Sequence, residues 1–255
     1  MLFKLRIVSI VLFLFLAGPA WGQPLPEKWV AAIAASRQLE TPAARIEYFS
    51  AQFLETPYQA GTLGGGPGQT EVLTVNLAAV DCFTLLDYVE AIRRSESADD
   101  FRQRLIKVRY RDGCIAWKSR RHFFSDWVEL KGIVDVTASI GGSATRQVGK
   151  RLNRQADGQL FLPAVPVRER TISYIPRADL SAEVLERLQS GDYLGIYSER
   201  DGLDVSHVGI AIRSENGLFF RHASSSKDVK KVTDVPLAGY LAERPGMIVF
   251  VALDP

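Results

Sequence analysis

The sequence has little excess charge of either sign, since 31 Lys and Arg residues stand against 29 Asp and Glu residues in a chain of 255. A protein that binds nucleic acid usually has a strong basic excess, so this balance argues against a nucleic-acid partner. Internal repeats and long low-complexity segments are also absent. After the first 22 residues, no apolar run is long enough to span a membrane. Nothing in the sequence indicates an oligomeric state.

The N-terminus holds the one long apolar run. Two basic residues precede this run, which covers 7–17, and small residues follow it at Ala20 and Gly22. The order predicts a signal peptide at 1–22, cleaved before Gln23. A membrane anchor is the alternative, but the run is short for a spanning helix of ~20 residues. We therefore expect an exported protein without a stable membrane anchor, periplasmic or, in a cell with no outer membrane, secreted.

The chain that remains after cleavage, 23–255, is long enough for a single domain with its own core. Its charge is balanced, with 29 basic and 29 acidic residues. We expect a helical N-terminal part at 24–56, an insertion at about 113–175 and a β-rich part at 190–255. Helices first and antiparallel strands later favour an α+β fold over a parallel α/β one.

Start and stop signals support several elements. Thr41-Pro42, Asp81 and either Asp179 or Ser181 suit helix starts, and Gly191 suits the turn after a helix. The segment 132–170 has no clear period and is expected to wind around the core. Helices are predicted at 26–37, 42–55, from 82 onward, 99–108 and 181–188, and strands at 71–77, 193–197, 205–212, 218–222 and 247–252.

Cys82 is the strongest candidate for chemistry. It follows the capping residue Asp81 at the start of a helix whose apolar positions 85, 86, 89 and 92 share one face. The positive field at a helix N-terminus favours the thiolate, which is the attacking species, and free backbone amides there can hold an oxyanion. The alternative is a small core residue on the apolar face.

The second cysteine opens two other interpretations. A Cys82–Cys114 disulfide would close a loop of about 30 residues in an exported protein. However, Cys114 follows a turn signal and resembles a buried strand residue, whereas Cys82 begins a helix. A zinc site from both cysteines and two histidines is also conceivable, but the spacing matches no usual ligand pattern.

A thiol nucleophile needs a base, and two of the three histidines lie on one predicted hairpin. A four-residue loop at 213–216 would place His207 directly opposite His222, ~5 Å apart at Cβ. One imidazole could then orient the other. The small residues Gly209 and Ala211 share the face of His207 and would leave room for the cysteine helix. Two polar residues on an exposed hairpin face are the alternative, and His122 is the second candidate for the base.

In their order, these motifs resemble the NlpC-type papain-like cysteine hydrolases of bacterial cell-wall metabolism. Asp81-Cys82, His207-Val208-Gly209 and Arg221-His222-Ala223 correspond to the nucleophile, the base and the orienting residue. The resemblance implies a papain-like domain with N-terminal helices and a nucleophile helix packed on an antiparallel sheet or small barrel. Phe83-Thr84 departs from the Ser-Gly that is common after the cysteine in the wider superfamily.

Longer segments resemble one branch, the N-acetylmuramoyl-L-alanine amidase-like group. They are 56–63, 80–84 and 121–127. The resemblance implies hydrolysis of the amide between N-acetylmuramic acid and L-alanine in peptidoglycan or its fragments (muropeptides), by Cys82, His207 and His222, with no metal or organic cofactor. Seven residues are candidates for substrate contact: Tyr58, Asp81, Arg120, Arg121, His122, Asp126 and Ser206.

Three other functions fit the same residues. A D-glutamyl endopeptidase could cut within the stem peptide on the same fold. A non-catalytic muropeptide-binding protein could use the same scaffold, although the retention of all three candidate catalytic residues argues against it. A disulfide-stapled export domain without activity is the third.

Overall fold

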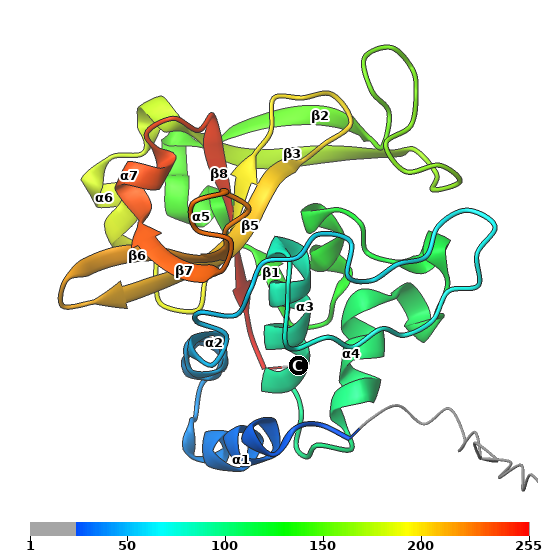
Figure 1. The fold of residues 1–255 in the computed structure, drawn as a ribbon. Coiled ribbons are helices and arrows are strands. Elements are labelled where there is room, and N and C mark those ends of the chain that lie inside the picture. Colours follow the sequence, from blue (N-terminus) through cyan, green and yellow to red (C-terminus); the bar gives the residue numbers. More distant parts are fainter. Residues whose placement is uncertain (1–23, 255) are drawn as a thin grey trace, which may run out of the picture.

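The computed structural model describes residues 24–254. The predicted signal peptide at 1–22 and its cleavage point lie outside the described residues. Helices fill the first part of the chain and antiparallel strands the last part, so the predicted α+β class is confirmed (Figure 1).

Residues 24–254 contain seven α-helices, three of which begin at the capping residues Thr41, Asp81 and Ser181. Thr41 accepts a hydrogen bond from the Ala44 amide at the start of α2, and Ser181 does the same for Val184 at the start of α6. Gly191 takes a φ of +91° in the turn that follows α6. The helices are α1 (Glu27–Ala35), α2 (Pro42–Ala51), α3 (Cys82–Arg93), α4 (Phe101–Arg109), α5 (Thr137–Gly141), α6 (Ala182–Glu186) and α7 (Leu237–Leu241).

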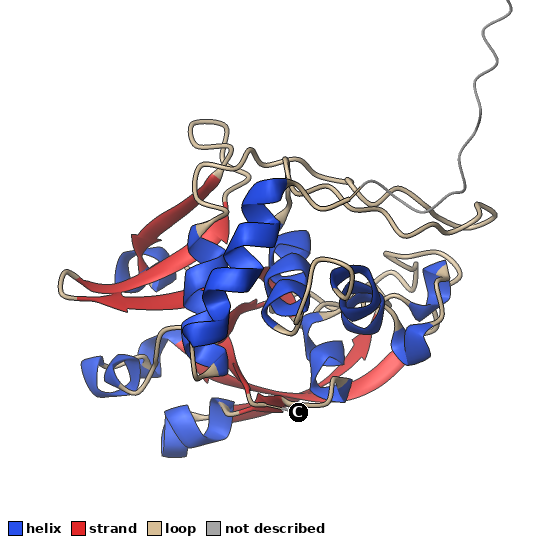
Figure 2. Ribbon diagram, turned by 90° about the horizontal axis from the view of Figure 1, so that it is seen from below, coloured by secondary structure: helices blue, strands red, loops and turns tan. Residues whose placement is uncertain are grey.

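Eight strands within the described part of the chain form one antiparallel sheet in the order β2-β3-β8-β4-β5-β6-β7, and β1 pairs separately with β8. Figure 2 shows these strands, in red, curving around a group of helices in blue. The strands are β1 (Ile133–Asp135), β2 (Arg146–Leu152), β3 (Arg168–Pro176), β4 (Tyr193–Tyr197), β5 (Val205–Ser214), β6 (Gly217–Ala223), β7 (Val232–Pro236) and β8 (Gly246–Ala252).

The sheet separates two apolar cores. Along β4, Tyr193 and Tyr197 face the larger core with α1 to α4, whereas Leu194 and Ile196 face a smaller core with α6 and α7. The same alternation along β5 directs Ile210 to α3. The helix that carries Cys82 is therefore packed on one face of the sheet, and α7 covers the other (Figure 1).

Three sequence predictions are wrong. Residues 71–77 are extended but join no sheet, because side chains bind their backbone: Arg109 donates to the Thr74 carbonyl at 2.7 Å. Cys114 is an exposed residue after a 3-10 turn, not part of a buried strand. The segment 132–170, which was expected to wind around the core, supplies β1, α5, β2 and the start of β3.

Among residues 24–254, no helix combines the length and the apolar character that crossing a membrane requires.

Candidate active site

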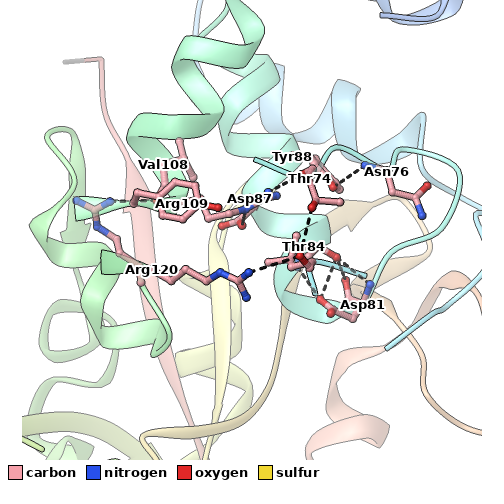
Figure 3. A network of polar contacts seen from close by, with 12 residues as sticks. Thr74, Asn76, Asp81, Thr84, Asp87, Tyr88, Val108, Arg109 and Arg120 are labelled. Carbon is pink, nitrogen blue, oxygen red and sulfur yellow. Dashed lines mark hydrogen bonds and ion pairs between the residues drawn. The ribbon is translucent and has the colours of Figure 1, made fainter. Parts of the chain in front are cut away.

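The first turn of α3 fixes Cys82. The Asp81 carboxylate accepts a hydrogen bond from the Thr84 amide at 2.7 Å, and the Thr84 hydroxyl accepts one from the Asp81 amide at 2.9 Å. This reciprocal capping box, drawn in Figure 3, leaves the first two amides of the helix, those of Cys82 and Phe83, without intrahelical partners. Both amides lower the pKa of the half-buried Cys82 thiol. Asp81 therefore acts on the cysteine through the helix end.

A buried network holds this helix in place. Arg109 of α4 donates to the Asp87 carboxylate at 2.8 Å and also to the Thr74 carbonyl (Figure 3). At the next residue of α3, the Tyr88 hydroxyl accepts a hydrogen bond from the Asn76 amide at 2.8 Å. The segment before Cys82 and the helix after it are thus tied to each other and to α4.

The two hairpin histidines touch each other. Nε2 of His207 lies 2.8 Å from Nδ1 of His222, which is hydrogen-bond distance, and the ring planes are nearly perpendicular. His222 is buried and His207 is half-buried. One imidazole therefore donates to the other, and Nδ1 of His207 remains free for a second partner.

The predicted register of the hairpin is wrong by two residues. Ser214 pairs with Gly217, so the turn has two residues instead of four, and the paired register ends at Ile210 opposite Arg221. Both histidines lie beyond that end, as diagonal neighbours on one face. Diagonal side chains are ~7–8 Å apart at Cα, which two imidazoles can span.

The predicted contact face of the cysteine helix is also wrong. The apolar residues of α3 pack against Val208 and Ile210, whereas Ala211 belongs to the core under α7. The small size of Gly209 serves another purpose. A Cβ atom there would lie 2.5 Å from the Phe220 ring and 2.6 Å from the Arg221 carbonyl oxygen.

We expect Gly209→Ala to destabilise the protein by about 2 kcal/mol, because backbone of β6 must move to admit the methyl group. The displaced strand carries His222, so activity should fall as well. Gly149→Ala is the matched control, since nothing lies within 4 Å of a Cβ at that strand position. Urea unfolding of both variants tests this, and equal stabilities would refute the packing role.

Cys82 lies at the same strand end as the histidines. Besides the two helix amides, the amide of Val208, the residue after His207, lowers the pKa of the Cys82 thiol. Burial and, after it, the Asp81 charge raise the pKa of the Cys82 thiol to about 12, although the three amides act in the opposite direction. The expectation that the helix field alone favours a resting thiolate is therefore not met, because desolvation outweighs that field.

Burial also keeps the histidines neutral. Burial first, with a smaller contribution from the Arg244 charge, lowers the pKa of His207 to about 3 and that of His222 to about 4. Two imidazoles in hydrogen-bond contact cannot both be charged without strong repulsion. At neutral pH the free site therefore holds a thiol and two neutral imidazoles.

The pair makes stability depend on pH. Between pH 6.5 and about 4, the unfolded chain protonates its histidines while the folded pair stays neutral, so the unfolded state binds more protons. The free energy of unfolding should therefore decrease as the pH falls through this window. In a His207→Gln, His222→Gln double variant the decrease should be smaller. Urea unfolding at pH 4.5, 5.5 and 6.5 tests this, and identical slopes would contradict it.

Two tyrosines adjoin the thiol. The backbone of Tyr58 forms an isolated β-bridge with Val80, two residues before Cys82. Burial raises the pKa of the Tyr58 phenol, and the charges of Cys82 and Asp81 contribute to the rise. Tyr240 of α7 places its ring 5.1 Å from that of His222 and 6.2 Å from that of His207. Burial raises the pKa of Tyr240, and Cys82 adds to the rise. The structure thus brings Tyr58, a predicted candidate, and Tyr240 to the site.

Four other candidates have internal partners. Arg120 donates to Glu71 at 2.6 Å and to the Gly64 carbonyl, and Arg121 donates to two carbonyls of α4. His122 contacts the Trp117 carbonyl at 2.8 Å. Asp126 is buried in ion pairs with Arg111 and Arg170. These contacts connect parts of the chain to one another, so in this structure the four side chains stabilise the fold.

Ser206 occupies an irregular position at the start of β5. The register between β4 and β5 shifts there, since Ile196 faces His207 and Tyr197 faces Val205. The exposed Ser206 is thus the extra residue of a bulge, which turns the strand just before His207.

Both cysteines are free, and Cys114 is exposed, so the alternative of a Cys82–Cys114 disulfide is wrong. Within residues 24–254, no cluster of three or more His, Cys, Asp and Glu side chains could hold a metal ion.

Sequence reasoning missed Tyr240, Lys230 and Arg244. Lys230, whose ammonium lies 4.8 Å from the centre of the Tyr58 ring, comes before β7, and Arg244 follows α7; neither element was predicted. The one signal for α7 was the helical spacing of Leu237 and Leu241 after Pro236, which is weak in so short a helix.

Comparison with known proteins gives a family. Residues 48–247 match the family model described as AmiA-like, N-acetylmuramoyl-L-alanine amidase-like. The structure of an N-acetylmuramoyl-L-alanine amidase from Bacteroides uniformis is similar, with 30% identity, a TM-score of 0.69 and coverage of 84% of this chain and 99% of that one.

Two further solved structures share the fold. A protein from Legionella pneumophila has 24% identity and a TM-score of 0.74, with coverage of 89% of this chain and 95% of that one. A putative xylanase from Bacteroides fragilis has 29% identity and a TM-score of 0.64, with coverage of 79% of this chain and 98% of that one. No curated protein matches the chain. The family model spans most of the chain, and the chain therefore belongs to the N-acetylmuramoyl-L-alanine amidase-like family.

Proposed function

We propose that this protein is a cysteine-dependent amidase in which Cys82 is the nucleophile, His207 the base and His222 the residue that orients the base. The observation that carries the proposal is the 2.8 Å contact between the two imidazoles, at the strand end where the Val208 amide lowers the pKa of the Cys82 thiol. A nucleophile, a base and an orienting group in this order also support a papain-like assignment.

Acylation follows from the neutral resting state. As the Cys82 sulfur attacks the substrate carbonyl, its proton passes to Nδ1 of His207, and the C–S bond forms. The amides of Cys82 and Phe83 can donate to the oxyanion that develops. The C–N bond then breaks, the His207 proton goes to the leaving amine, and a thioester remains.

Deacylation reverses the roles. His207 takes a proton from water, whose oxygen attacks the thioester carbonyl. When the C–S bond breaks, the sulfur regains a proton from His207 and the carboxylic acid product is released. His222 keeps the base in place by its hydrogen bond to Nε2 and shares the charge of the imidazolium.

The leading substrate is the amide between N-acetylmuramic acid and L-alanine, in peptidoglycan or in released muropeptides. The family match and the named amidase from Bacteroides uniformis support this choice. An endopeptidase that cuts after D-glutamate would use the same three residues. A glycosidase, which the xylanase name would suggest, usually needs two carboxyl groups that flank the bond, whereas the candidate groups here are a free thiol and two imidazoles in contact with each other.

Digestion of purified muropeptides and mass spectrometry of the products test the choice. We expect release of an intact peptide that begins with L-alanine, together with the free sugar. Cleavage after D-glutamate would overturn the amidase in favour of the endopeptidase, and cleavage between sugars would favour a glycosidase.

We also propose that the enzyme is exported to the periplasm, or secreted where no outer membrane exists. The pattern of residues 1–22 supports this. N-terminal sequencing of the protein from its native cell should give Gln23 as the first residue, and an N-terminus at Met1 would refute the cleavage.

A further inference from the structure

Two exposed cations at the site have no ion-pair partner within residues 24–254. The Lys230 ammonium lies 4.8 Å from the centre of the Tyr58 ring, and the Arg244 guanidinium lies 5.0 Å from that of Tyr240. The next residue, Lys231, differs, since it pairs with Glu55 at 2.6 Å. The charges of Lys230 and Arg244 are thus left for a partner outside the described chain.

Each cation is stacked on a tyrosine that adjoins the catalytic groups. The Tyr58 amide donates to the Lys230 carbonyl at 2.9 Å, and Tyr58 bridges Val80, two residues before Cys82. The Tyr240 ring contacts His222, with ring centres 5.1 Å apart. Stacking on a ring holds a flexible cationic side chain in a defined place, which lowers the entropy lost when it binds an anion.

Both cations belong to one continuous segment. The segment consists of β7 followed directly by α7. Lys230 lies just before it and Arg244 just after it, so the two cations stand at its opposite ends. Arg244 is close enough to both histidines to lower their pKa values. Asp234 of β7 acts on His222 in the opposite direction, but its carboxylate is paired with Arg221. The segment therefore places one unpaired positive charge, that of Arg244, beside the two histidines, and the reaction steps do not use it.

We propose that Lys230 and Arg244 bind carboxylates in the peptide part of the substrate and so make the enzyme selective for acidic peptides. This inference rests on the proposed function. An amide cut next to L-alanine leaves a peptide whose next residue is D-glutamate, so its carboxylate lies one residue beyond the bond. Charge-assisted hydrogen bonds from two cations would recognise that group and would discriminate against the neutral amide form.

The test compares two substrates that differ in one group: a muramoyl tripeptide with a free D-glutamate α-carboxylate, and the same molecule with this carboxylate amidated. At pH 8, where both histidines are neutral, Lys230→Met and Arg244→Gln should each raise KM for the acidic substrate about tenfold, with kcat within about twofold. The double variant should lose about a hundredfold in kcat/KM. With the amidated substrate, all variants should have the same KM and kcat as the wild-type enzyme.

Lys227→Met is the matched control, because Lys227 is an exposed lysine of the same loop with no ring beneath it. It should leave both substrates unaffected. The inference would be overturned if all variants had the KM of the wild-type enzyme for the acidic substrate. It would also be overturned if the variants lost kcat/KM equally for both substrates. If the unchanged enzyme cuts neither tripeptide nor larger muropeptides at this bond, the proposed function itself fails, and the two failures are thus distinguishable.

Discussion

Replacement of Cys82 by alanine should lower kcat by at least about 10⁴-fold, because no other group near His207 can form the thioester. The fold should persist, since the capping box that begins α3 is made by Asp81 and Thr84 and not by the cysteine. Turnover of a muropeptide followed by mass spectrometry gives the first quantity, and urea unfolding gives the second.

Cys114→Ala is the matched control, as its thiol is exposed and lies apart from the histidines in the chain. We expect its activity to be unchanged. Normal turnover by Cys82→Ala would refute the cysteine mechanism. If the unchanged protein and Cys82→Ala bind a muropeptide equally well and neither hydrolyses it, the non-catalytic binding protein becomes the better interpretation.

Replacement of Glu90 by leucine should destabilise the fold by about 3–5 kcal/mol, because it leaves buried charges without a partner. The Glu90 carboxylate is fully buried and accepts hydrogen bonds from Arg93 at 2.6 and 2.7 Å, from Arg94, and from the Tyr193 hydroxyl at 2.7 Å. The last contact links α3 to the central strand β4. Urea unfolding at neutral pH measures the loss.

The control is a pair with the same spacing at the surface. Glu183 and Arg187 form an i,i+4 ion pair on α6 with both side chains exposed, so Glu183→Leu should cost below about 0.5 kcal/mol. A loss of similar size in the two variants would contradict the argument from burial. A Glu90→Leu protein that folds should also lose activity, since α3 positions Cys82.

The features of the site that sequence predicted are those with local causes. Asp81 at the cap and the apolar positions of α3 follow from helix geometry, and both are seen. His207 and His222 fall on one face in either register, because a shift of two residues preserves the alternation of a strand. This explains why their contact was expected although the turn length was wrong.

The features that sequence did not predict depend on distant parts of the chain. Asp87, Glu90 and Arg93 look like the solvent side of α3, yet they are buried because α4 and β4 cover that side. Arg120 looks like a candidate for binding a substrate carboxylate, yet it is taken by Glu71, 49 residues away. Tyr240 enters the site from α7, whose position depends on the pairing of β6 with β7.

The neutral resting state of Cys82 has a consequence for the lifetime of the enzyme. Peroxides and other oxidants attack thiolates much faster than thiols. A thiol whose pKa is raised to about 12 is therefore protected from oxidation between turnovers. In an oxidising compartment outside the cytoplasm, where we propose that this protein acts, the burial that makes the nucleophile harder to activate also keeps it reduced.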